Sequence, residues 1–336
     1  RRMEKLLEIK NLETAFRIKD DYFNAVDKVS LDLYKNEVLA IVGESGCGKS
    51  TLATTIMRLH NENLTKSTGE IIFNGKNILD LTEDEMNKIR TKDIGMIFQD
   101  PLSSLNPLHR IGKQIEEALI YHTELSAEER QKRVIELLTQ VGIPNPERCA
   151  KQYPHELSGG MRQRVMIAMA MSCKPSVLIA DEPTTALDVT IQAQILDLIK
   201  GLQAEMHAGI ILITHDLGVV AEMADRVAVL YAGEVVEIGT AEQIFKNPKH
   251  PYTRSLLRSI PQLDDEDSSD DLYVIQGMVP SLKTLDRQGC RFADRISWLK
   301  DEEHEHNPTL HEVEEGHHVR CTCYKNFEFE GEENNA

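Results

Sequence analysis

The chain of 336 residues carries the stretch Gly43-Glu44-Ser45-Gly46-Cys47-Gly48-Lys49-Ser50, and this stretch decides its fold. The stretch has the spacing G-x-x-x-x-G-K-[ST] of a phosphate-binding loop (P-loop). It follows the apolar run Val38–Val42, which has strand length, and a helix is predicted to begin near Lys49. Glycines let a backbone wrap closely around phosphate, and the N–H groups at a helix start favour an anion. With both neighbours in place, a chance glycine-rich turn is a poor explanation.

The chemistry of such a loop assigns a role to particular side chains. Lys49 is placed to neutralise charge on the β- and γ-phosphates, and the Ser50 hydroxyl can bind Mg²⁺. Thr51 adds another hydroxyl in the first helical turn. The residues predicted to bind nucleotide here are Gly43, Glu44, Ser45, Gly46, Cys47, Gly48, Lys49, Ser50 and Thr51.

A second motif lies far downstream, where the apolar strand 177–180 ends in Asp181 and Glu182. Asp181 is suited to hold Mg²⁺, and Glu182 is suited to polarise an attacking water as general base. Buried strands often end in solvated acids, but next to a P-loop this pair indicates nucleotide hydrolysis. The two motifs predict a P-loop NTPase without saying which kind, since kinases, motors and transport ATPases share them.

Apolar periodicity outlines the rest of the fold. Alternation around Leu7 and again around Val29 predicts half-buried strands near the N-terminus. Further strands are predicted at 69–73, 94–98, 177–180, 210–214 and 226–231. Helical periodicity dominates residues 111–172. Strands that alternate with helices predict an α/β fold with a mainly parallel sheet. To this core we add an N-terminal antiparallel β subdomain and an inserted helical subdomain at about residues 102–172.

The charge of the chain is concentrated near its C-terminal end. The whole chain has 55 acidic and 38 basic residues, a net charge of −17, and residues 264–336 hold 19 of the acids and 7 of the bases. The change begins at the acidic run 264–271, which we interpret as a solvated linker between domains 1–263 and 264–336. Such acidity disfavours binding to nucleic acid or to an anionic lipid surface.

The sequence shows neither a membrane span nor a secretion signal. No window holds 18 consecutive apolar residues, and the N-terminus has neither a long apolar stretch nor a small-residue cleavage site. The scattered cysteines indicate a reducing, cytosolic compartment rather than a disulfide framework. They are Cys47, Cys149, Cys173, Cys290, Cys321 and Cys323.

The stretch Leu157-Ser158-Gly159-Gly160-Met161 resembles the signature motif of ATP-binding-cassette (ABC) ATPases, and it lies shortly before Asp181, as in that family. Ser158 can cap the following helix, and the glycines let N–H groups face a phosphate. The resemblance implies that Ser158, Gly159 and Gly160 cover the γ-phosphate of an ATP held by a partner subunit. A P-loop kinase, the alternative enzyme class, has no such motif.

The other motifs of ABC ATPases are present in order. By resemblance, Gln99 contacts Mg²⁺ and links the site to the helical insertion, Asp188 lies at the dimer interface, and His215 contacts the γ-phosphate and orients Glu182. An aromatic ring is expected to stack on adenine. Phe16 is the first candidate, with Tyr22 or Phe23 as alternatives.

Four longer stretches resemble the ATPase subunits of oligopeptide, dipeptide and nickel importers, and they are 98–107, 250–257, 275–282 and 289–295. The resemblance implies an ATPase that powers oligopeptide import from the cytoplasmic face of the cell membrane. Its expected partners are a second, usually non-identical ABC ATPase, two transmembrane permease subunits and an extracytoplasmic peptide-binding protein. Dipeptides, nickel or another small solute remain alternative cargoes. A soluble ABC protein that acts on DNA or ribosomes is a further alternative, but the chain lacks a second cassette, a coiled coil and a basic face.

The C-terminal region departs from many relatives, in which four cysteines hold an iron–sulfur cluster. Cys290 and Cys321 match the first and last of these cysteines, but Ile296 occupies the second position and the third falls near Glu303. A [4Fe–4S] cluster held by four thiolates is therefore doubtful. A cluster of His304, His306, His311, His317 and His318 with Cys321 and Cys323 also suits Zn²⁺. Its spacing matches no standard zinc finger, and an exposed polar tail would have the same composition.

Overall fold

The computed structural model describes residues 3–260 and 273–332. These residues form two compact units. Of the described residues, the first unit is built from 3–8, 32–38 and 71–213, and the second from 9–31, 39–70, 214–260 and 273–332. The acidic run 264–271 and the domain boundary predicted at residue 263 lie outside the described residues. Within the described part of the chain, no helix is both long enough and apolar enough to cross a bilayer.

The first unit contains three parallel strands in the order β8-β7-β6. They are β6 (Ile94–Ile97), β7 (Val177–Asp181) and β8 (Gly209–Ile213). Ile94 pairs with Val177, and Val177 pairs with Gly209. All residues of these strands are buried, which explains why they read as continuous apolar runs instead of alternating patterns.

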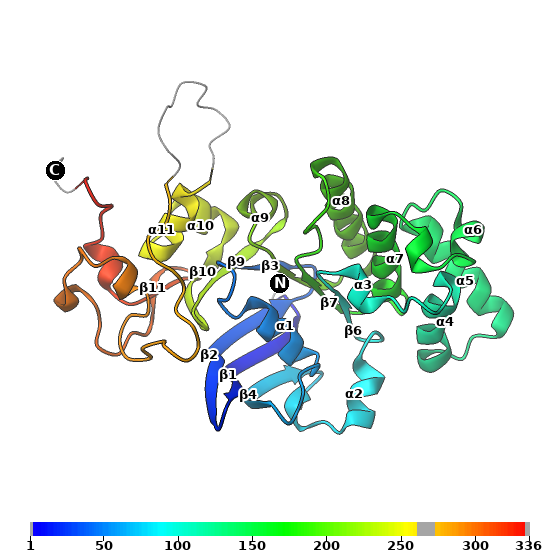
Figure 1. Cartoon of the computed structure of the whole chain (residues 1–336), viewed down its shortest axis with the longest axis horizontal. Coiled ribbons are helices and arrows are strands. Elements are labelled where there is room, and N and C mark those ends of the chain that lie inside the picture. Colours follow the sequence, from blue (N-terminus) through cyan, green and yellow to red (C-terminus); the bar gives the residue numbers. More distant parts are fainter. Residues whose placement is uncertain (1–2, 261–272, 333–336) are drawn as a thin grey trace. The chain divides into compact units, whose positions relative to one another are not determined.

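Helices make up most of the remaining first unit, and the predicted helical insertion is present (Figure 1). The helices are α2 (Glu83–Ile89), α3 (Pro101–Ser104), α4 (Ile111–His122), α5 (Ala127–Gln140), α6 (Pro146–Ala150), α7 (Gly159–Met171) and α8 (Val189–Met206). Within the insertion, α4 packs against α5, α6 and α7. Apolar residues on one side of each long helix, such as Ile115 and Leu138, form the core between them.

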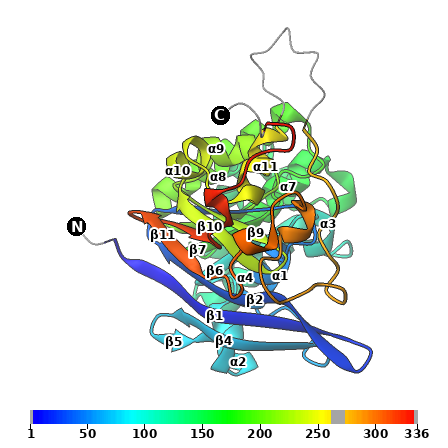
Figure 2. The ribbon, with the colours of Figure 1, turned by 90° about the vertical axis from the view of Figure 1, so that its left-hand side faces the viewer.

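In the second unit, the strand that leads into the P-loop belongs to a mixed sheet of order β11-β12-β10-β9-β3. The strands are β3 (Val38–Val42), β9 (Arg226–Tyr231), β10 (Glu234–Thr240), β11 (Leu310–Glu314) and β12 (His317–Arg320). β3 and β9 are parallel, with Ile41 opposite Ala228, and the remaining pairs are antiparallel. The hairpin β11–β12 thus adds C-terminal residues to the sheet of the nucleotide loop, with β12 paired to β10, and Figure 2 shows the hairpin in orange to red near β10.

A second, four-stranded sheet has the order β2-β1-β4-β5. Its strands are β1 (Lys5–Ile18), β2 (Asp21–Tyr34), β4 (Thr65–Phe73) and β5 (Lys76–Asn77), and residues of the first three belong partly to each unit. Only two residues connect β1 to β2, which requires an antiparallel pair. The predicted N-terminal antiparallel subdomain is therefore present.

The helices of the second unit are short, and the core beneath them extends into the C-terminal region. They are α1 (Lys49–Ile56), α9 (Leu217–Met223), α10 (Ala241–Lys246) and α11 (Pro251–Arg258). One hydrophobic cluster joins Val42 of β3 and Tyr231 of β9 to Tyr252, Phe292 and Phe327. The ring centroids of Tyr231 and Tyr252 lie 4.6 Å apart. The C-terminal residues therefore share one core with the strand that carries the P-loop.

Candidate functional site

The P-loop between β3 and α1 depends on two glycines. A Cβ atom on Gly43 would lie 2.3 Å from the carbonyl oxygen of Leu230, and one on Gly48 would lie 2.5 Å from the carbonyl oxygen of Ala25. Gly48 also has a φ of +101°. Any side chain at either position would push the loop away from these neighbours. The two glycines thus hold the loop in its close-packed conformation.

The side chains of Lys49 and Cys47 are buried inside the loop. The Lys49 ammonium donates a hydrogen bond of 2.5 Å to the carbonyl oxygen of Gly43, and the residue is 6% exposed. Burial raises the pKa of the Cys47 thiol to about 11, and the nearby Lys49 charge opposes this shift only in part. Cys47 is therefore a neutral packing residue at physiological pH, and Lys49 remains the residue predicted to neutralise phosphate charge.

Glu44 is held in place by two residues from the C-terminal part of the chain, a role that the motif does not predict. Its backbone N–H donates to the Tyr252 hydroxyl at 2.8 Å. Both of its carboxylate oxygens accept hydrogen bonds from the Arg295 guanidinium, at 2.6 and 3.1 Å. Arg295 also donates to the carbonyl oxygen of Gln276, and its side chain is 5% exposed. Such a bidentate pair fixes orientation as well as charge, so the P-loop is held from outside its own motif.

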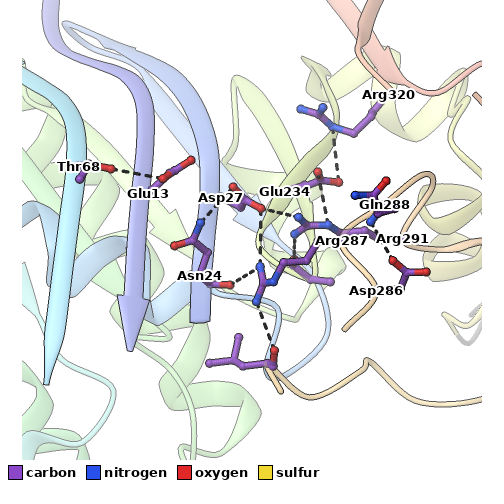
Figure 3. A network of polar contacts seen from close by, with 12 residues as sticks. Glu13, Asn24, Asp27, Thr68, Glu234, Asp286, Arg287, Gln288, Arg291 and Arg320 are labelled. Atoms are coloured by element: carbon purple, nitrogen blue, oxygen red, sulfur yellow. Dashed lines mark hydrogen bonds and ion pairs between the residues drawn. The ribbon is translucent and has the colours of Figure 1, made fainter. Parts of the chain in front are cut away.

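A second group of arginines connects the same segment to β2 (Figure 3). The Arg291 guanidinium donates to Asp27 at 2.5 Å and to the carbonyl oxygen of Ala232 at 2.7 Å. Arg287 also lies within 3.7 Å of the Asp27 carboxylate, and Glu234 pairs with Arg291 at 3.5 Å. Burial raises the pKa of Glu234, and the nearby arginines oppose this effect. The residues around the P-loop are thus fixed by buried charge pairs.

His215 lies after β8 in the second unit, and it lines a cavity of about 370 Å³ together with Gly43 and Glu44. The imidazole is exposed. The next residue, Asp216, caps α9 by accepting hydrogen bonds from the N–H groups of Gly218 and Val219. The structure therefore brings the predicted switch histidine to the same cavity as the start of the P-loop.

Of the three aromatic candidates for adenine stacking, Phe16 lies on β1, and Tyr22 and Phe23 lie on β2. Phe16 is half-buried and packs edge-to-face against His60, with 5.2 Å between ring centroids. Tyr22 is half-buried as well, and the Lys66 ammonium lies 3.9 Å from the centre of its ring. Neither contact distinguishes Phe16 from Tyr22, so Phe16 remains the prediction.

Asp181 and Glu182 end β7 in the first unit. Asp181 is 6% exposed, and Glu182 follows it with a φ of +46°. The Glu182 N–H donates to the carbonyl oxygen of Ile213 at 2.8 Å, which holds this left-handed conformation in place. A left-handed backbone at a residue with a side chain costs of order 1–3 kcal/mol, and such residues gather at functional sites.

The signature helix α7 begins at an exposed end. Ser158 caps it, because its hydroxyl accepts a hydrogen bond from the Met161 N–H at 3.3 Å, and both Ser158 and Gly159 are exposed. Gly160 is buried, and a Cβ there would lie 3.3 Å from the side chain of Ile191 on α8. Gln163 donates from its side-chain amide to the carbonyl oxygen of Pro183. The helix is therefore anchored to the loop after Glu182, while its N-terminus faces outward.

Gln99 and Asp188 are exposed as well. Gln99 lies two residues after the end of β6, and α3 begins two residues later. Asp188 caps α8, since its carboxylate accepts a hydrogen bond from the Ile191 N–H at 3.0 Å, and Val189 beside it is 80% exposed. Both predicted motif residues are thus available to a ligand or a partner.

The C-terminal cysteines lie close together. The ligand atoms of Cys290, His304, Cys321 and Cys323 all lie within 4.8 Å of one another. The four-cysteine cluster of relatives does not fit this chain, because Ile296, at the second cysteine position, is buried in the hydrophobic core. Three of the other histidines of the predicted set have carboxylate partners instead. His311 pairs with Glu305, His317 with Glu237 and Glu314, and His318 with Glu312.

Comparison with known families gives two matches. A family model described as ABC transporter matches residues 26–185, which contain the P-loop, the signature motif and Asp181. A second model, described as the C-terminal region of oligopeptide and dipeptide transporters, matches residues 236–297. The second match includes Tyr252, Cys290 and Arg295.

Individual relatives cover almost the whole chain. The oligopeptide transport ATP-binding protein OppD of Lactococcus lactis subsp. cremoris (strain SK11) is 54% identical over 97% of this chain and 96% of its own length. The dipeptide transport ATP-binding protein DppD of Bacillus subtilis (strain 168) is 52% identical over 87% of each chain. A solved dimeric ATP-binding cassette in a post-hydrolysis state, bound to ADP and Pi, is 34% identical, with a TM-score of 0.63, over 70% of this chain and 99% of its own.

Proposed function

This chain belongs to the ABC transporter family of ATP-binding proteins, and from this premise we propose that it powers the import of oligopeptides. It is an ABC ATPase. The main support for oligopeptides as the substrate is the extent of the similarity to an oligopeptide transport protein. The oligopeptide transport relative is 54% identical over 97% of this chain, and the match to the C-terminal region of peptide transporters adds to it.

The motif residues supply the hydrolytic chemistry. Lys49 and the backbone of the P-loop hold the phosphates of ATP, and Mg²⁺ is to be held by Ser50, Gln99 and Asp181. Glu182 takes a proton from the attacking water as that water approaches the γ-phosphate, and His215 orients Glu182. The left-handed backbone of Glu182 supports its role, because residues in this costly conformation gather at functional sites.

The exposed signature motif supports a dimer of ABC ATPases. Ser158 and Gly159 face outward, and a Cβ on Gly159 would meet no heavy atom within 4 Å among the described residues. Internal packing therefore does not explain the glycine, whereas close approach to a phosphate bound by a partner subunit does. Asp188 and Val189 are exposed as well and would lie at the same interface.

The region after Gln99 is the proposed contact with the membrane subunits. Leu102 on α3 is 56% exposed and Leu108 after it is 81% exposed, so two apolar side chains near Gln99 are open to a partner. The Gln114 side chain holds this loop in shape, since its amide group bonds to the backbone of Asn106 and His109 at 2.8 Å. An ordered loop with exposed leucines next to Gln99 fits the coupling of ATP closure to permease subunits at the cytoplasmic face.

Dipeptides are the second candidate cargo, because the dipeptide transport relative is nearly as similar, at 52% identity. Cargo choice is expected to reside in the membrane and binding subunits and not in the ATPase. Purification of the chain from solubilised membranes, with identification of the co-purified subunits and transport assays on peptides of two to ten residues, decides between them. Recovery without any integral membrane protein would contradict the import function.

The hydrolytic assignment is tested by Glu182→Gln in the assembled transporter. We expect ATP hydrolysis to fall by about 10²–10⁴-fold, the usual range for loss of a general base, while ATP binding persists. Glu222→Gln on α9 is the matched control, because Glu222 is an exposed glutamate outside every motif. Hydrolysis by the Glu182→Gln variant at the rate of the control would rule out the general-base role.

A further inference from the structure

Four potential ligands converge in the C-terminal region from distant parts of the chain. Cys290 precedes the short 3-10 helix Ala293–Arg295, and His304 follows the 3-10 helix Asp301–Glu303. Cys321 and Cys323 follow the end of β12. Their three sulfur atoms and one imidazole nitrogen all lie within 4.8 Å of one another. Cys321 and Cys323 are fully buried, and the other two residues are partly buried.

The His304 ring is an independent sign of a ligand. Both of its ring nitrogens are inaccessible to water, and neither has a hydrogen-bond partner among the described residues. A buried polar group without a partner costs of order 1–3 kcal/mol. A bond from one nitrogen to a metal ion would remove that cost for this nitrogen.

The backbone around Cys321 also favours binding of a ligand by its sulfur atom. Cys321 has a φ of +69°, the left-handed conformation that a residue with a side chain seldom adopts. Its sulfur accepts a hydrogen bond from the Glu305 N–H at 3.2 Å. The left-handed turn places Cys321 and Cys323 near the same point, and the N–H group stabilises negative charge on the sulfur.

We propose that Cys290, His304, Cys321 and Cys323 bind a single Zn²⁺ ion in a closed structural site. Three thiolates and one imidazole are a common ligand set for structural zinc. A tetrahedral ion with Zn–S bonds of about 2.3 Å sets its sulfurs about 3.8 Å apart. This spacing is compatible with the four ligand atoms, which lie within 4.8 Å of one another. A four-iron cluster needs four thiolates around a larger group of iron and sulfide atoms, and the fourth thiolate is missing.

The ion would tie two segments of the second unit together. One segment carries Cys290 with Arg291 and Arg295, and the other is the end of β12. Arg295 holds Glu44 of the P-loop, so the zinc site would stabilise the segment from which that contact is made. The role is structural, because all four zinc positions are filled by the protein. No part of ATP hydrolysis passes through it.

The test is metal analysis of the full chain, purified without added metal or chelator from medium that contains both zinc and iron. We expect about one zinc per chain and no acid-labile sulfide. His304→Ala and Cys323→Ser should weaken zinc binding at least about tenfold in competition with a chromogenic chelator. His306→Ala and Cys173→Ser are the matched controls, since neither residue belongs to the group of four. His304→Cys should retain the zinc, because a fourth thiolate also suits the ion.

A measurement on the unmodified chain covers the case in which a variant fails to fold. The metal-free chain should take up one equivalent of Co²⁺ and show the absorption of tetrahedral, thiolate-bound cobalt, which one equivalent of Zn²⁺ abolishes. Iron with labile sulfide in the purified chain would overturn the proposal in favour of a cluster. A chain that binds neither Zn²⁺ nor Co²⁺, or equal zinc loss in His304→Ala and His306→Ala, would also overturn it.

Discussion

The two units hold their motif residues in different ways. In the second unit, the P-loop is surrounded by partners from its own chain. Lys49 is buried against Gly43, and Glu44 is held by Tyr252 and Arg295. In the first unit, the signature residues Ser158 and Gly159 and the cap residue Asp188 are exposed and bonded only within their own turns.

The difference shows which half of the ATP chemistry is complete within one chain. The P-loop is preorganised, so its binding of phosphate costs little further ordering. The signature end of α7 is ordered but has no ligand supplied by the described residues of its own chain. A single chain is therefore expected to bind ATP and to hydrolyse it only weakly, until a second ABC ATPase completes the site.

The largest effect is expected for Gly159→Arg, which tests whether the signature motif acts on ATP bound by a partner subunit. We expect ATP hydrolysis by the assembled transporter to fall by about 10²–10³-fold, the usual loss when one group that stabilises transition-state charge is removed or blocked. ATP binding by the isolated chain should change by less than about twofold, since a Cβ atom at Gly159 would meet no heavy atom within 4 Å among the described residues outside its own turn. Titration with a fluorescent ATP analogue measures the second quantity. Equal losses in binding and hydrolysis would mean that the signature motif serves its own P-loop.

Arg295→Met tests the other half of the comparison. Loss of the bidentate pair frees Glu44, and we expect the affinity of the isolated chain for ATP to fall about tenfold, or about 1.4 kcal/mol. Arg295→Lys should restore only part of it, because an ammonium cannot bond both carboxylate oxygens in the same geometry. Arg258→Met is the control, since Arg258 forms a more exposed pair with Glu332. An unchanged affinity for ATP would show that the contact is only structural.

A smaller effect is expected at Phe16. If its ring stacks on adenine, Phe16→Leu should weaken ATP binding about fivefold while leaving inorganic pyrophosphate binding unchanged, because stacking contributes of order 0.5–1.5 kcal/mol. Tyr22→Leu is the comparison variant. A larger loss with Tyr22→Leu would assign the stacking role to Tyr22. Isothermal titration calorimetry measures all four affinities.

The smallest effect concerns pH and the seam between β10 and β12. Burial lowers the pKa of His317, but hydrogen bonds to Glu237 and Glu314 outweigh this, so its pKa is raised. The stabilisation of the folded chain by protonated His317 is therefore fully present below the ordinary histidine pKa of about 6.5. It is lost as pH rises through the higher pKa that His317 has in the folded chain. Urea unfolding should show that His317→Gln destabilises the chain more at pH 6 than at pH 9. A difference of the opposite sign would contradict the raised pKa.

The parts of the fold that the sequence predicted are those set by local pattern. The apolar runs of β3, β7 and β8 were placed to within one residue, because strands buried on both faces leave a continuous signal. The family and fold inferred from the motifs are confirmed by the comparisons. The positions of the motifs at strand ends and helix starts followed from the same local rules.

The parts that were missed depend on contacts between distant residues. Glu237 on β10 and His317 on β12 form a buried pair. In the sequence, each of these polar residues indicates an exposed position, and only the pairing of the two strands shows that both are buried. The contact of Arg295 with Glu44 joins residues that no spacing rule connects. His304 was one of several histidines in the sequence, and only the fold separates it from His306.

The hydrophobic cluster around Tyr231 also limits how the chain can be dissected. Phe292, Ile296 and Phe327 pack into the same cluster as Val42, directly before the P-loop. A stop codon placed after residue 260 would remove these three residues and expose apolar surface beneath Tyr231 and Tyr252. A chain shortened in this way would lose solubility, so its ATP binding and hydrolysis could not be measured. Affinity tags and reporter fusions therefore belong at the ends of the chain. Domain swaps with other ABC ATPases need to carry β3 and the segment 292–327 together.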